Sequence, residues 1–207
     1  MVEVEGVDFH FTTRSVFLGL RLHLGAGVTW LRGRNGRGKT TLLKLLGGAL
    51  SPAACSIRLD GLDSRRDALA YRAASFYCGG EAPALAWLTV AEWLDLHLSL
   101  YDGADPALLE ALLDAFHIAD VARQPVTGLS LGQYKKLQLA LALSLPARLL
   151  LLDEPFNGLD AQAIAVLEQH LHRRAARRDT CIVLTSHVDP GIVPDTVLDL
   201  DAQPGVL

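Results

Sequence analysis

Residues 33–40 read Gly33-Arg34-Asn35-Gly36-Arg37-Gly38-Lys39-Thr40, which is the pattern G-x-x-x-x-G-K-T. The strand-like run Val28–Leu31 precedes this stretch and the helix-like run Lys39–Leu46 begins within it, which is the context in which the pattern binds phosphate. Glycines let consecutive backbone N–H groups curl around a phosphate, and the helix N-terminus adds positive potential. The stretch therefore predicts a phosphate-binding loop that extends to Thr41. We expect Lys39 to reach the β- and γ-phosphates of a nucleotide and Thr40 to offer a hydroxyl to Mg²⁺.

A second pattern is Leu149-Leu150-Leu151-Leu152-Asp153-Glu154, where an apolar run ends in two acids. In α/β sheets the carboxyl ends of buried strands carry the ligand chemistry. We expect Asp153 to hold Mg²⁺ through water and Glu154 to polarise an attacking water molecule. A strand that merely ends in solvated acids is the alternative, and the phosphate-binding loop in the same chain disfavours it.

Between these two patterns, residues 129–133 read Leu129-Ser130-Leu131-Gly132-Gln133. Ser130 and Gln133 have the S-x-x-Q spacing of a capping box, which predicts that Ser130 caps a helix continuing as YKKLQLALAL. A capped helix N-terminus also attracts anions. An ordinary cap, which stabilises a helix by about 1 kcal/mol, is compatible with such a functional role.

The LSLGQ stretch resembles the LSGGQ signature of ABC (ATP-binding cassette) ATPases, and further motifs of that family follow in the family's order. Leu88-Thr89-Val90-Ala91-Glu92 looks like the start of the family's helical subdomain, and Asn157-Gly158-Leu159-Asp160 resembles its D-loop. The resemblance implies that Ser130, Gly132 and Gln133 complete the ATP site of a second subunit. It also implies that Asp160 couples the two sites.

Two single residues gain a role from the same resemblance. Phe11 occupies the place of the aromatic residue that family members stack on adenine, and Ser186-His187 matches the catalytic switch histidine that contacts the γ-phosphate. Taken singly, Phe11 would be a core residue and His187 a polar loop residue. Their order and spacing within the family pattern favour the functional interpretation.

The chain departs from the family pattern at four named positions. Leu131 stands where glycine is usual, beside the phosphate site of the second subunit, and Glu81 stands where glutamine is usual. The resemblance implies that Glu81 contacts Mg²⁺, unless the register is wrong and Glu81 is a solvated loop residue. Arg34 replaces a frequent proline, and Arg37 adds a cation to the phosphate-binding loop. None of these changes removes a group that the chemistry requires.

Short β-like runs alternate with helical patterns, which predicts an α/β fold. Val2–Val7 and Leu18–Leu24 alternate apolar and polar residues, as is typical of half-exposed antiparallel strands. Thr89 with Glu92 predicts a capped helix that runs through Leu100. The expected buried strands are Val28–Leu31, Ser75–Cys78, Leu149–Leu152 and Cys181–Ser186, and the expected helices include those at Lys39–Leu46, at Ala161–Arg178 and after Asp105-Pro106.

We therefore expect one domain over residues 1–207, with a P-loop NTPase (RecA-like) core and an antiparallel N-terminal β-subdomain. The core is assigned to residues 1–79 and 134–207, and an inserted α-helical subdomain to residues 80–133. The basic cluster Arg173, Arg174, Arg177 and Arg178 closes the last expected helix, where cations complement the helix dipole. Contact with a lipid headgroup or a partner is the alternative for this cluster.

Composition limits the possible classes. The 207 residues are half hydrophobic and carry a formal net charge of −4, which gives no support for nucleic-acid binding. The most apolar stretch, Leu137–Leu152, is broken by Pro146 and Arg148 and is shorter than the ~20 residues of a spanning helix. The N-terminus lacks the pattern of a signal peptide, and the three cysteines show no C-x-x-C spacing. We expect a cytoplasmic protein with no direct membrane insertion.

The resemblance implies an ATP-binding and ATP-hydrolysing subunit of a membrane transporter, attached to the inner face of the cell membrane through a separate transmembrane permease. ATP and Mg²⁺ would bind between two such subunits, and a homodimer is favoured over a pair of related chains. Val16–Gly27 and Leu149–Asp160 look like the ATP-binding subunits of the haem exporters of cytochrome c maturation, and an exporter of drugs, peptides or lipids fits as well. The alternatives are a soluble ABC ATPase without a transport role and a poorly hydrolysing partner in an asymmetric heterodimer.

Overall fold

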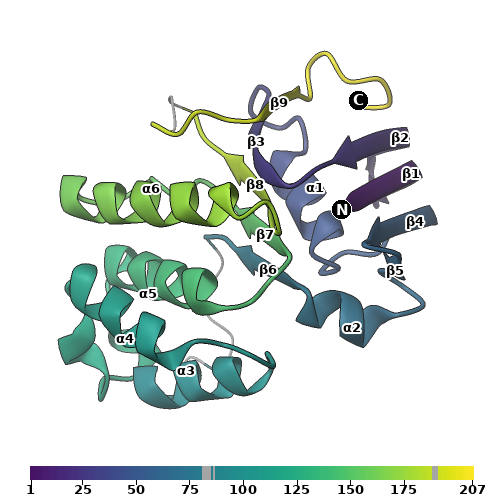
Figure 1. Cartoon of the computed structure of the whole chain (residues 1–207). Coiled ribbons are helices and arrows are strands. Elements are labelled where there is room, and N and C mark those ends of the chain that lie inside the picture. The colour runs from purple at the N-terminus through teal and green to yellow at the C-terminus, as the bar shows by residue number, and fades with distance from the viewer. Residues whose placement is uncertain (81–84, 86, 188–190) are drawn as a thin grey trace.

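The computed structural model describes residues 1–80, 85, 87–187 and 191–207, and two β-sheets with flanking helices make up its architecture (Figure 1). The strands are β1 (Val2–Phe11), β2 (Arg14–Leu24), β3 (Gly27–Arg32), β4 (Ala54–Leu59), β5 (Leu62–Asp63), β6 (Ser75–Cys78), β7 (Leu149–Leu152), β8 (Cys181–Thr185) and β9 (Thr196–Asp199). The helices are α1 (Lys39–Leu46), α2 (Ala68–Ala73), α3 (Val90–Ser99), α4 (Pro106–Ala115), α5 (Leu131–Ser144) and α6 (Ala161–Ala176), with 3-10 turns η1 (Ala119–Val121) and η2 (Val126–Gly128). None of the helices in these ranges is both long and apolar enough to cross a bilayer.

The smaller sheet is antiparallel and has the strand order β2-β1-β4-β5. Alternate residues of β1, among them Val2 and Val4, are buried while their neighbours face outward, so one face of this sheet lies on a core. The spacing widens to three between Val4 and Val7, where the pairing register shifts and Gly6 takes a left-handed φ of 64°. This irregularity has the character of a β-bulge and returns Val7 to the buried face. The predicted half-exposed antiparallel strands are thus confirmed.

The larger sheet is parallel throughout and has the order β6-β7-β8-β3-β9. Its strand β7 is fully buried because both faces of the sheet are covered. Leu149 and Leu151 pack in a core with α1 and the antiparallel sheet, whereas Leu150 and Leu152 pack in a second core with α5 and α6. Because β7 is buried on both faces, it requires an apolar residue at every position and not only at alternate ones.

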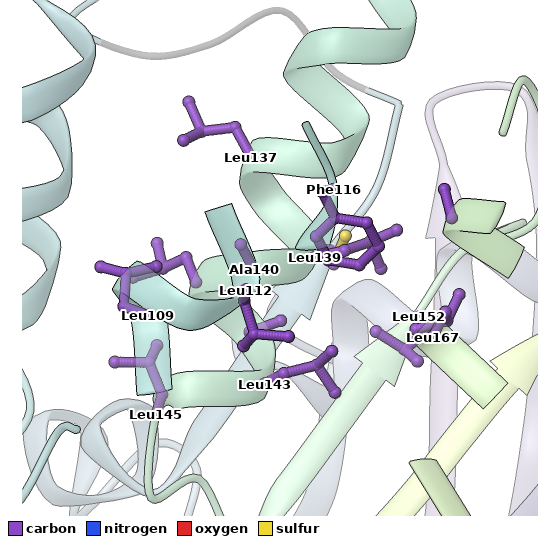
Figure 2. Packing of buried hydrophobic residues seen from close by; sticks show 14 of the residues in the cluster. Leu109, Leu112, Phe116, Leu137, Leu139, Ala140, Leu143, Leu145, Leu152 and Leu167 are labelled. Atoms are coloured by element: carbon purple, nitrogen blue, oxygen red, sulfur yellow. The ribbon is translucent and has the colours of Figure 1, made fainter. Parts of the chain in front are cut away.

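The second core, which we call the helical-side core, joins the parallel sheet to α3, α4, α5 and α6 (Figures 1 and 2). Leu112 of α4, Leu139 of α5 and Leu152 of β7 are all within it and are at most 1% exposed. Each such leucine contributes about 1.5–3 kcal/mol by its removal from water. Helices α3 to α6 therefore share one core with β7, the strand that directly precedes Asp153.

Both predicted capping boxes are present. Thr89 Oγ1 accepts the backbone N–H of Glu92 at 3.3 Å, and Glu92 Oε2 accepts the N–H of Thr89 at 2.9 Å. Ser130 and Gln133 make the same pair of bonds at 3.2 Å and 2.9 Å at the start of α5. Asp105 caps α4, with Pro106 at its first position, as predicted. These caps fix where α3, α4 and α5 begin.

The structure differs from expectation near the end of α6. The helix ends at Ala176, two residues before Arg178. The guanidinium of Arg174 was expected at the carbonyl end of its own helix, α6, but it bonds another part of the chain. The Arg174 guanidinium instead donates to the carbonyl oxygens of Ala142 at 3.1 Å and Ala147 at 2.6 Å, at and beyond the end of α5. Burial lowers the pKa of Arg174 to about 10. The last expected strand ends at Thr185, not at Ser186, and the sequence did not reveal β4, β5, α2 or β9.

Candidate nucleotide-binding site

The loop at residues 33–40 connects β3 to α1 at the carboxyl end of the parallel sheet. Gly36 and Gly38 adopt left-handed φ values of 79° and 89°. A Cβ on Gly38 would lie 2.7 Å from Val16 Cγ1 and 3.0 Å from Phe17 Cζ, so β2 leaves no room for a side chain there. Glycine is required both by the dihedral angle and by the close approach of β2. The loop is thus a backbone cradle of the kind that fits phosphate.

Lys39 opens α1 and is held inside this loop. The residue is only 9% exposed, and its Nζ donates to the carbonyl oxygens of Gly33 at 2.6 Å and Arg34 at 3.3 Å. Both partners are neutral, so the positive charge stays uncompensated by them. The first N–H groups of α1 have no acceptor within the helix. A cation and a helix N-terminus therefore act together, and both favour an anion.

Asp153 and Glu154 directly follow β7. The Asp153 carboxylate accepts a hydrogen bond of 2.8 Å from Thr185 Oγ1 on β8 and one of 3.2 Å from the Tyr77 hydroxyl on β6. Two neutral hydroxyls orient this carboxylate and leave its charge available to a metal ion. Glu154 has a left-handed φ of 50°, a conformation unusual for a residue with a side chain, and its N–H donates to Thr185 Oγ1 at 2.8 Å.

The side chain of Glu154 meets the residue that follows β8. His187 Nε2 lies 3.2 Å from Glu154 Oε1, a distance typical of an ion pair. Glu154 Oε1 is nevertheless buried and has no aligned hydrogen-bond donor in the part of the chain that the structure describes. A buried acceptor in this state costs free energy that a bound water or ligand donor would recover. This oxygen is therefore available to accept a hydrogen bond.

These groups line one cavity of about 420 Å³. Phe11, which is 49% exposed, is among them and contacts Phe9 edge-on with ring centroids 5.0 Å apart. An aromatic face, a backbone cradle, a cation and paired acids around one cavity fit a nucleotide with its magnesium ion. The lining comprises Phe11, Arg14, Val16, Asn35, Gly36, Gly38, Lys39, Thr40, Thr41, Asp153, Glu154 and His187.

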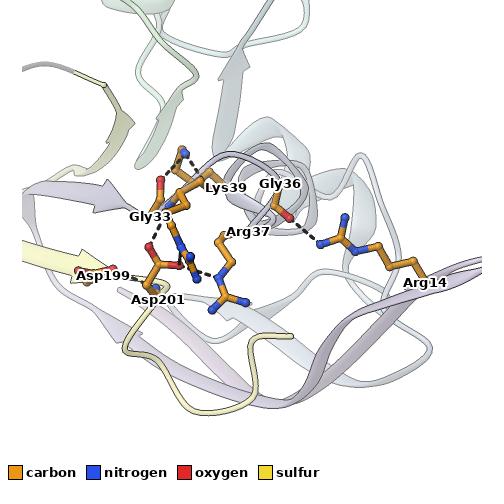
Figure 3. A network of polar contacts seen from close by, with 8 residues as sticks. Arg14, Gly33, Gly36, Arg37, Lys39, Asp199 and Asp201 are labelled. Atoms are coloured by element: carbon orange, nitrogen blue, oxygen red, sulfur yellow. Dashed lines mark hydrogen bonds and ion pairs between the residues drawn. The ribbon is translucent and has the colours of Figure 1, made fainter.

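Other residues expected at the site lie elsewhere. The Arg37 side chain contacts Asp201 (Figure 3). The Arg34 side chain contacts the same carboxylate, and neither arginine is part of the cavity lining. Ser130 and Gln133, which the resemblance assigns to the ATP site of a second subunit, also lie outside that lining, as does Asp160. Glu81, expected as a metal ligand, lies outside the described residues, and its metal contact stays a prediction.

A second cavity of about 760 Å³ begins at the acids and extends to the start of α5. Thr40 and Asp153 lie in its lining as well as in the first, and Leu131 and Gly132 lie at its other end. Leu131 is 91% exposed although it is a large apolar residue. Gly80, the residue before Glu81, also lines this cavity.

Asp160 has two structural partners. It accepts the N–H of Ala163 at 2.9 Å as the N-cap of α6, and Lys136 Nζ on α5 lies 2.5 Å from its Oδ2. The Lys136 ammonium, with the N–H of Ala163, lowers the pKa of Asp160 to about 2. Asp160 therefore stays ionised, and it ties the start of α6 to the first turns of α5.

The structure adds residues at the site that had not been predicted, among them Arg14, Val16, Tyr77, Thr185 and Asp201. Thr185 had a signal, since it lies two residues before His187 at the end of an expected strand. Tyr77 lies in the expected strand Ser75–Cys78, but no pattern shows which strand neighbours β7. Asp201 is 164 residues from Arg37, and nothing in the local sequence connects the two.

Comparison with known proteins agrees with this geometry. A family model described as ABC transporter matches residues 18–157, which span the phosphate-binding loop, the signature and the acids after β7. The chain belongs to this family and is one of its ATP-binding subunits. The predicted family and the predicted α/β class, with a P-loop core and an antiparallel sheet, are both confirmed.

The relatives narrow this class. The chain is 37% identical over 195 residues to the cytochrome c biogenesis ATP-binding export protein CcmA of Paramagnetospirillum magneticum, covering 91% of this chain and 88% of the relative. It is 39% identical over 193 residues to CcmA of Pseudomonas syringae pv. syringae, with the same coverage of 91% and 88%. A solved ATP-binding subunit of an ABC transporter superposes with a TM-score of 0.82 at 26% identity, covering 91% of this chain and 80% of that one. The resemblance to CcmA proteins is therefore shown as well.

Proposed function

We propose that this subunit binds ATP with Mg²⁺ in the 420 Å³ cavity and hydrolyses it to drive export through a separate transmembrane permease. The observation that carries the proposal is the convergence of Lys39, Asp153, Glu154 and His187 on that cavity. These residues come from loops after β3, β7 and β8, so the carboxyl ends of adjacent parallel strands assemble the site.

Binding would use the groups that are preorganised around the cradle. Lys39 would exchange its two carbonyl partners for the β- and γ-phosphates, and the backbone N–H groups of the first turn of α1 would donate to phosphate oxygens. Thr40 and Asp153 would hold Mg²⁺, and Glu81 is proposed as a further ligand. The bound ion would neutralise charge on the phosphates. Phe11 would stack on the adenine.

Glu154 would act on the attacking water. Its buried Oε1 needs a donor, and a water placed there could transfer its proton to the carboxylate as it attacks. His187, 3.2 Å from the same oxygen, would orient Glu154 and contact the γ-phosphate. Asn157 Nδ2 donates to the other oxygen, Oε2, at 3.4 Å and holds the carboxylate from the opposite side.

A second copy of the chain would complete the site. Ser130, Gly132 and Gln133 lie at the N-terminus of α5, outside the lining of the cavity that holds Lys39. A helix N-terminus that presents N–H groups suits the γ-phosphate of a nucleotide bound to the other copy. A dimeric cassette bound to ADP and Pi has the same fold, with a TM-score of 0.76 at 20% identity and coverage of 91% of this chain and 88% of that one.

Export and the membrane partner rest on the relatives, which are named as export proteins of cytochrome c biogenesis. We infer that this chain serves a related export system from the cytoplasmic face of the membrane, attached through its permease. The transported molecule would be selected by the permease and not by this subunit.

The test is ATP binding and phosphate release by the purified protein, alone and with a candidate transmembrane permease. Wild type should bind a fluorescent ATP analogue and release phosphate only when Mg²⁺ is present. Lys39→Ala should lose binding, whereas Lys44→Ala, on the same helix but outside the cavity lining, should retain it. Absence of nucleotide binding by a folded wild-type protein would refute the proposal.

A further inference from the structure

Asp201 lies two residues after β9, and its carboxylate contacts the phosphate-binding loop (Figure 3). Its Oδ2 accepts the backbone N–H of Arg34 at 2.9 Å. Its Oδ1 accepts Nε of Arg37 at 2.6 Å and, more weakly, Nε of Arg34 at 3.4 Å. One carboxylate from the C-terminal segment therefore binds both the backbone and the side chains of the loop.

The two contacted residues are the ends of one turn. The N–H of Arg37 donates to the carbonyl oxygen of Arg34 at 3.3 Å, which closes the turn Arg34–Arg37. Asp201 bridges the same two residues, Arg34 and Arg37. A further side chain contacts the turn, since Arg14 Nη2 donates to the carbonyl oxygen of Gly36 at 3.0 Å. The turn includes Gly36, whose left-handed φ of 79° gives the loop its curvature. Asp201 thus contacts both ends of the turn that carries this curvature.

Asp201 is itself firmly placed. Strand β9 pairs with β3 up to Asp199 opposite Arg32, and the N–H of Leu200 donates to the carbonyl of Arg32 at 3.0 Å. The N–H of Asp201 donates to Asp199 Oδ1 at 2.9 Å. The hydrogen bond from Arg37 lowers the pKa of Asp201 to about 2, so the carboxylate stays ionised at neutral pH. Strand pairing and a local turn therefore deliver a permanent negative charge to the loop.

The contacts with Asp201 affect whether Arg34 and Arg37 are available to bind phosphate. Both are cations in a loop expected to bind phosphate, yet neither side chain lines the cavity. Asp201 neutralises Arg37 and directs it away from the cavity, so Lys39 is the loop cation that remains for the nucleotide. An anion next to a phosphate site would weaken binding if it were unpaired, but here it is compensated by two guanidinium groups.

We propose that Asp201 is a positioning residue for nucleotide binding, which bridges Arg34 and Arg37 and so holds the phosphate-binding loop in its receptive curvature before the nucleotide arrives. This inference rests on the proposed ATP site. Ordering the loop in advance lowers the entropy lost on binding, so the effect is on affinity and not on the chemical step.

The experiment measures the affinity of the full-length protein for a fluorescent ADP analogue, together with KM and kcat for ATP. Asp201→Ala should weaken binding roughly fivefold, since it removes a charge-assisted pair whose two side chains are 26% and 28% exposed. KM should rise by a similar factor with kcat nearly unchanged, and amide exchange at residues 33–38 should accelerate. Asp114→Ala on α4 is the matched control, because that carboxylate makes no ion pair with another described residue.

Arg37→Gln and the double variant separate positioning from direct phosphate contact. If Asp201 acts through Arg37, the double variant should bind no more weakly than the weaker single variant. If Arg37 binds phosphate itself, Arg37→Gln should lose further affinity in the Asp201→Ala background, and the proposal fails. Equal or tighter binding by Asp201→Ala also overturns it. If Asp201→Ala does not fold, unchanged affinity in Arg37→Gln overturns the positioning proposal. A wild-type protein that binds no nucleotide refutes the ATP site instead.

Discussion

Thr185 Oγ1 donates a hydrogen bond of 2.8 Å to Asp153 Oδ1 and accepts one of 2.8 Å from the backbone N–H of Glu154. It therefore contacts both acidic residues that follow β7. A residue of β8 thus sets the orientation of the expected Mg²⁺ ligand and of the expected base. Threonine is buried here, with an exposure of 0%, so the hydroxyl cannot be replaced by solvent.

Thr185→Val should therefore affect both stability and metal use. Valine keeps the shape but leaves the Glu154 N–H without an acceptor, which should lower the free energy of unfolding by about 1–3 kcal/mol. The Mg²⁺ concentration for half-maximal ATP hydrolysis should rise severalfold, because Asp153 is no longer held. Thr185→Ser keeps the hydroxyl and should stay close to wild type in both measurements. A Mg²⁺ dependence unchanged in Thr185→Val would show that Tyr77 alone suffices.

Glu154→Gln should separate binding from chemistry. Glutamine keeps the size and an acceptor oxygen but cannot take a proton, so turnover should fall by ~10²–10⁴ while ATP affinity stays near that of wild type. Phosphate release measures turnover and equilibrium binding measures ATP affinity, and both are determined on the same preparation. Near-normal turnover in the presence of the permease would exclude Glu154 as the base.

The slow Glu154→Gln variant should also reveal the second copy. It should sediment as a dimer with ATP and as a monomer without it, because each bound γ-phosphate would hold the α5 N-terminus of the other copy. Adding Ser130→Arg should abolish the dimer by filling that anion site, whereas Ser99→Arg, at the last residue of α3, should not. If both arginine variants dimerise equally, the contact does not involve the signature.

Arg174 should be important for stability and not for catalysis. Its guanidinium is mostly buried and bonds the carbonyl of Ala142 near the end of α5, far along that helix from Ser130. Arg174→Met should lower the free energy of unfolding by about 2 kcal/mol, since it leaves several carbonyl oxygens unpaired. Arg173→Met, at the exposed neighbouring position, should change it little, as chemical denaturation can show. Equal effects of the two would point to the net charge of the cluster.

His97 should make stability depend on pH. Burial lowers its pKa from the usual 6.5, so the unfolded chain takes up a proton at a higher pH than the folded protein. The free energy of unfolding should therefore be highest above about pH 6.5 and fall as the pH drops through the lowered folded pKa. His97→Phe retains a ring against Trp93 and should flatten this dependence. Parallel curves for the variant and wild type would assign the effect to other groups, such as His170.

The sequence predicted the elements whose signals are local. Patterns of only a few residues predict the loop at residues 33–40, the caps at Thr89 and Ser130, and the buried strand β7. β4 and β9 depend on pairing with strands that are distant in the sequence, β1 and β3, and β5 has only two residues, which pair with β4. The Asp201 contact could not be predicted because the fold alone places residue 201 beside residue 37, and two arginines in a phosphate-binding loop had suggested phosphate contact instead. The Glu81 assignment remains a prediction.

The ion pair between Lys136 and Asp160 has a mechanical consequence. Gly132 lies so close to this region that a Cβ there would be 3.4 Å from the carbonyl oxygen of Gly158. The start of α5 and the residues before α6 are thus pinned together by a charge contact and a close backbone approach. They lie against each other as neighbouring parts of one surface. A second copy of the chain that contacts the start of α5 would therefore also lie close to the residues before α6.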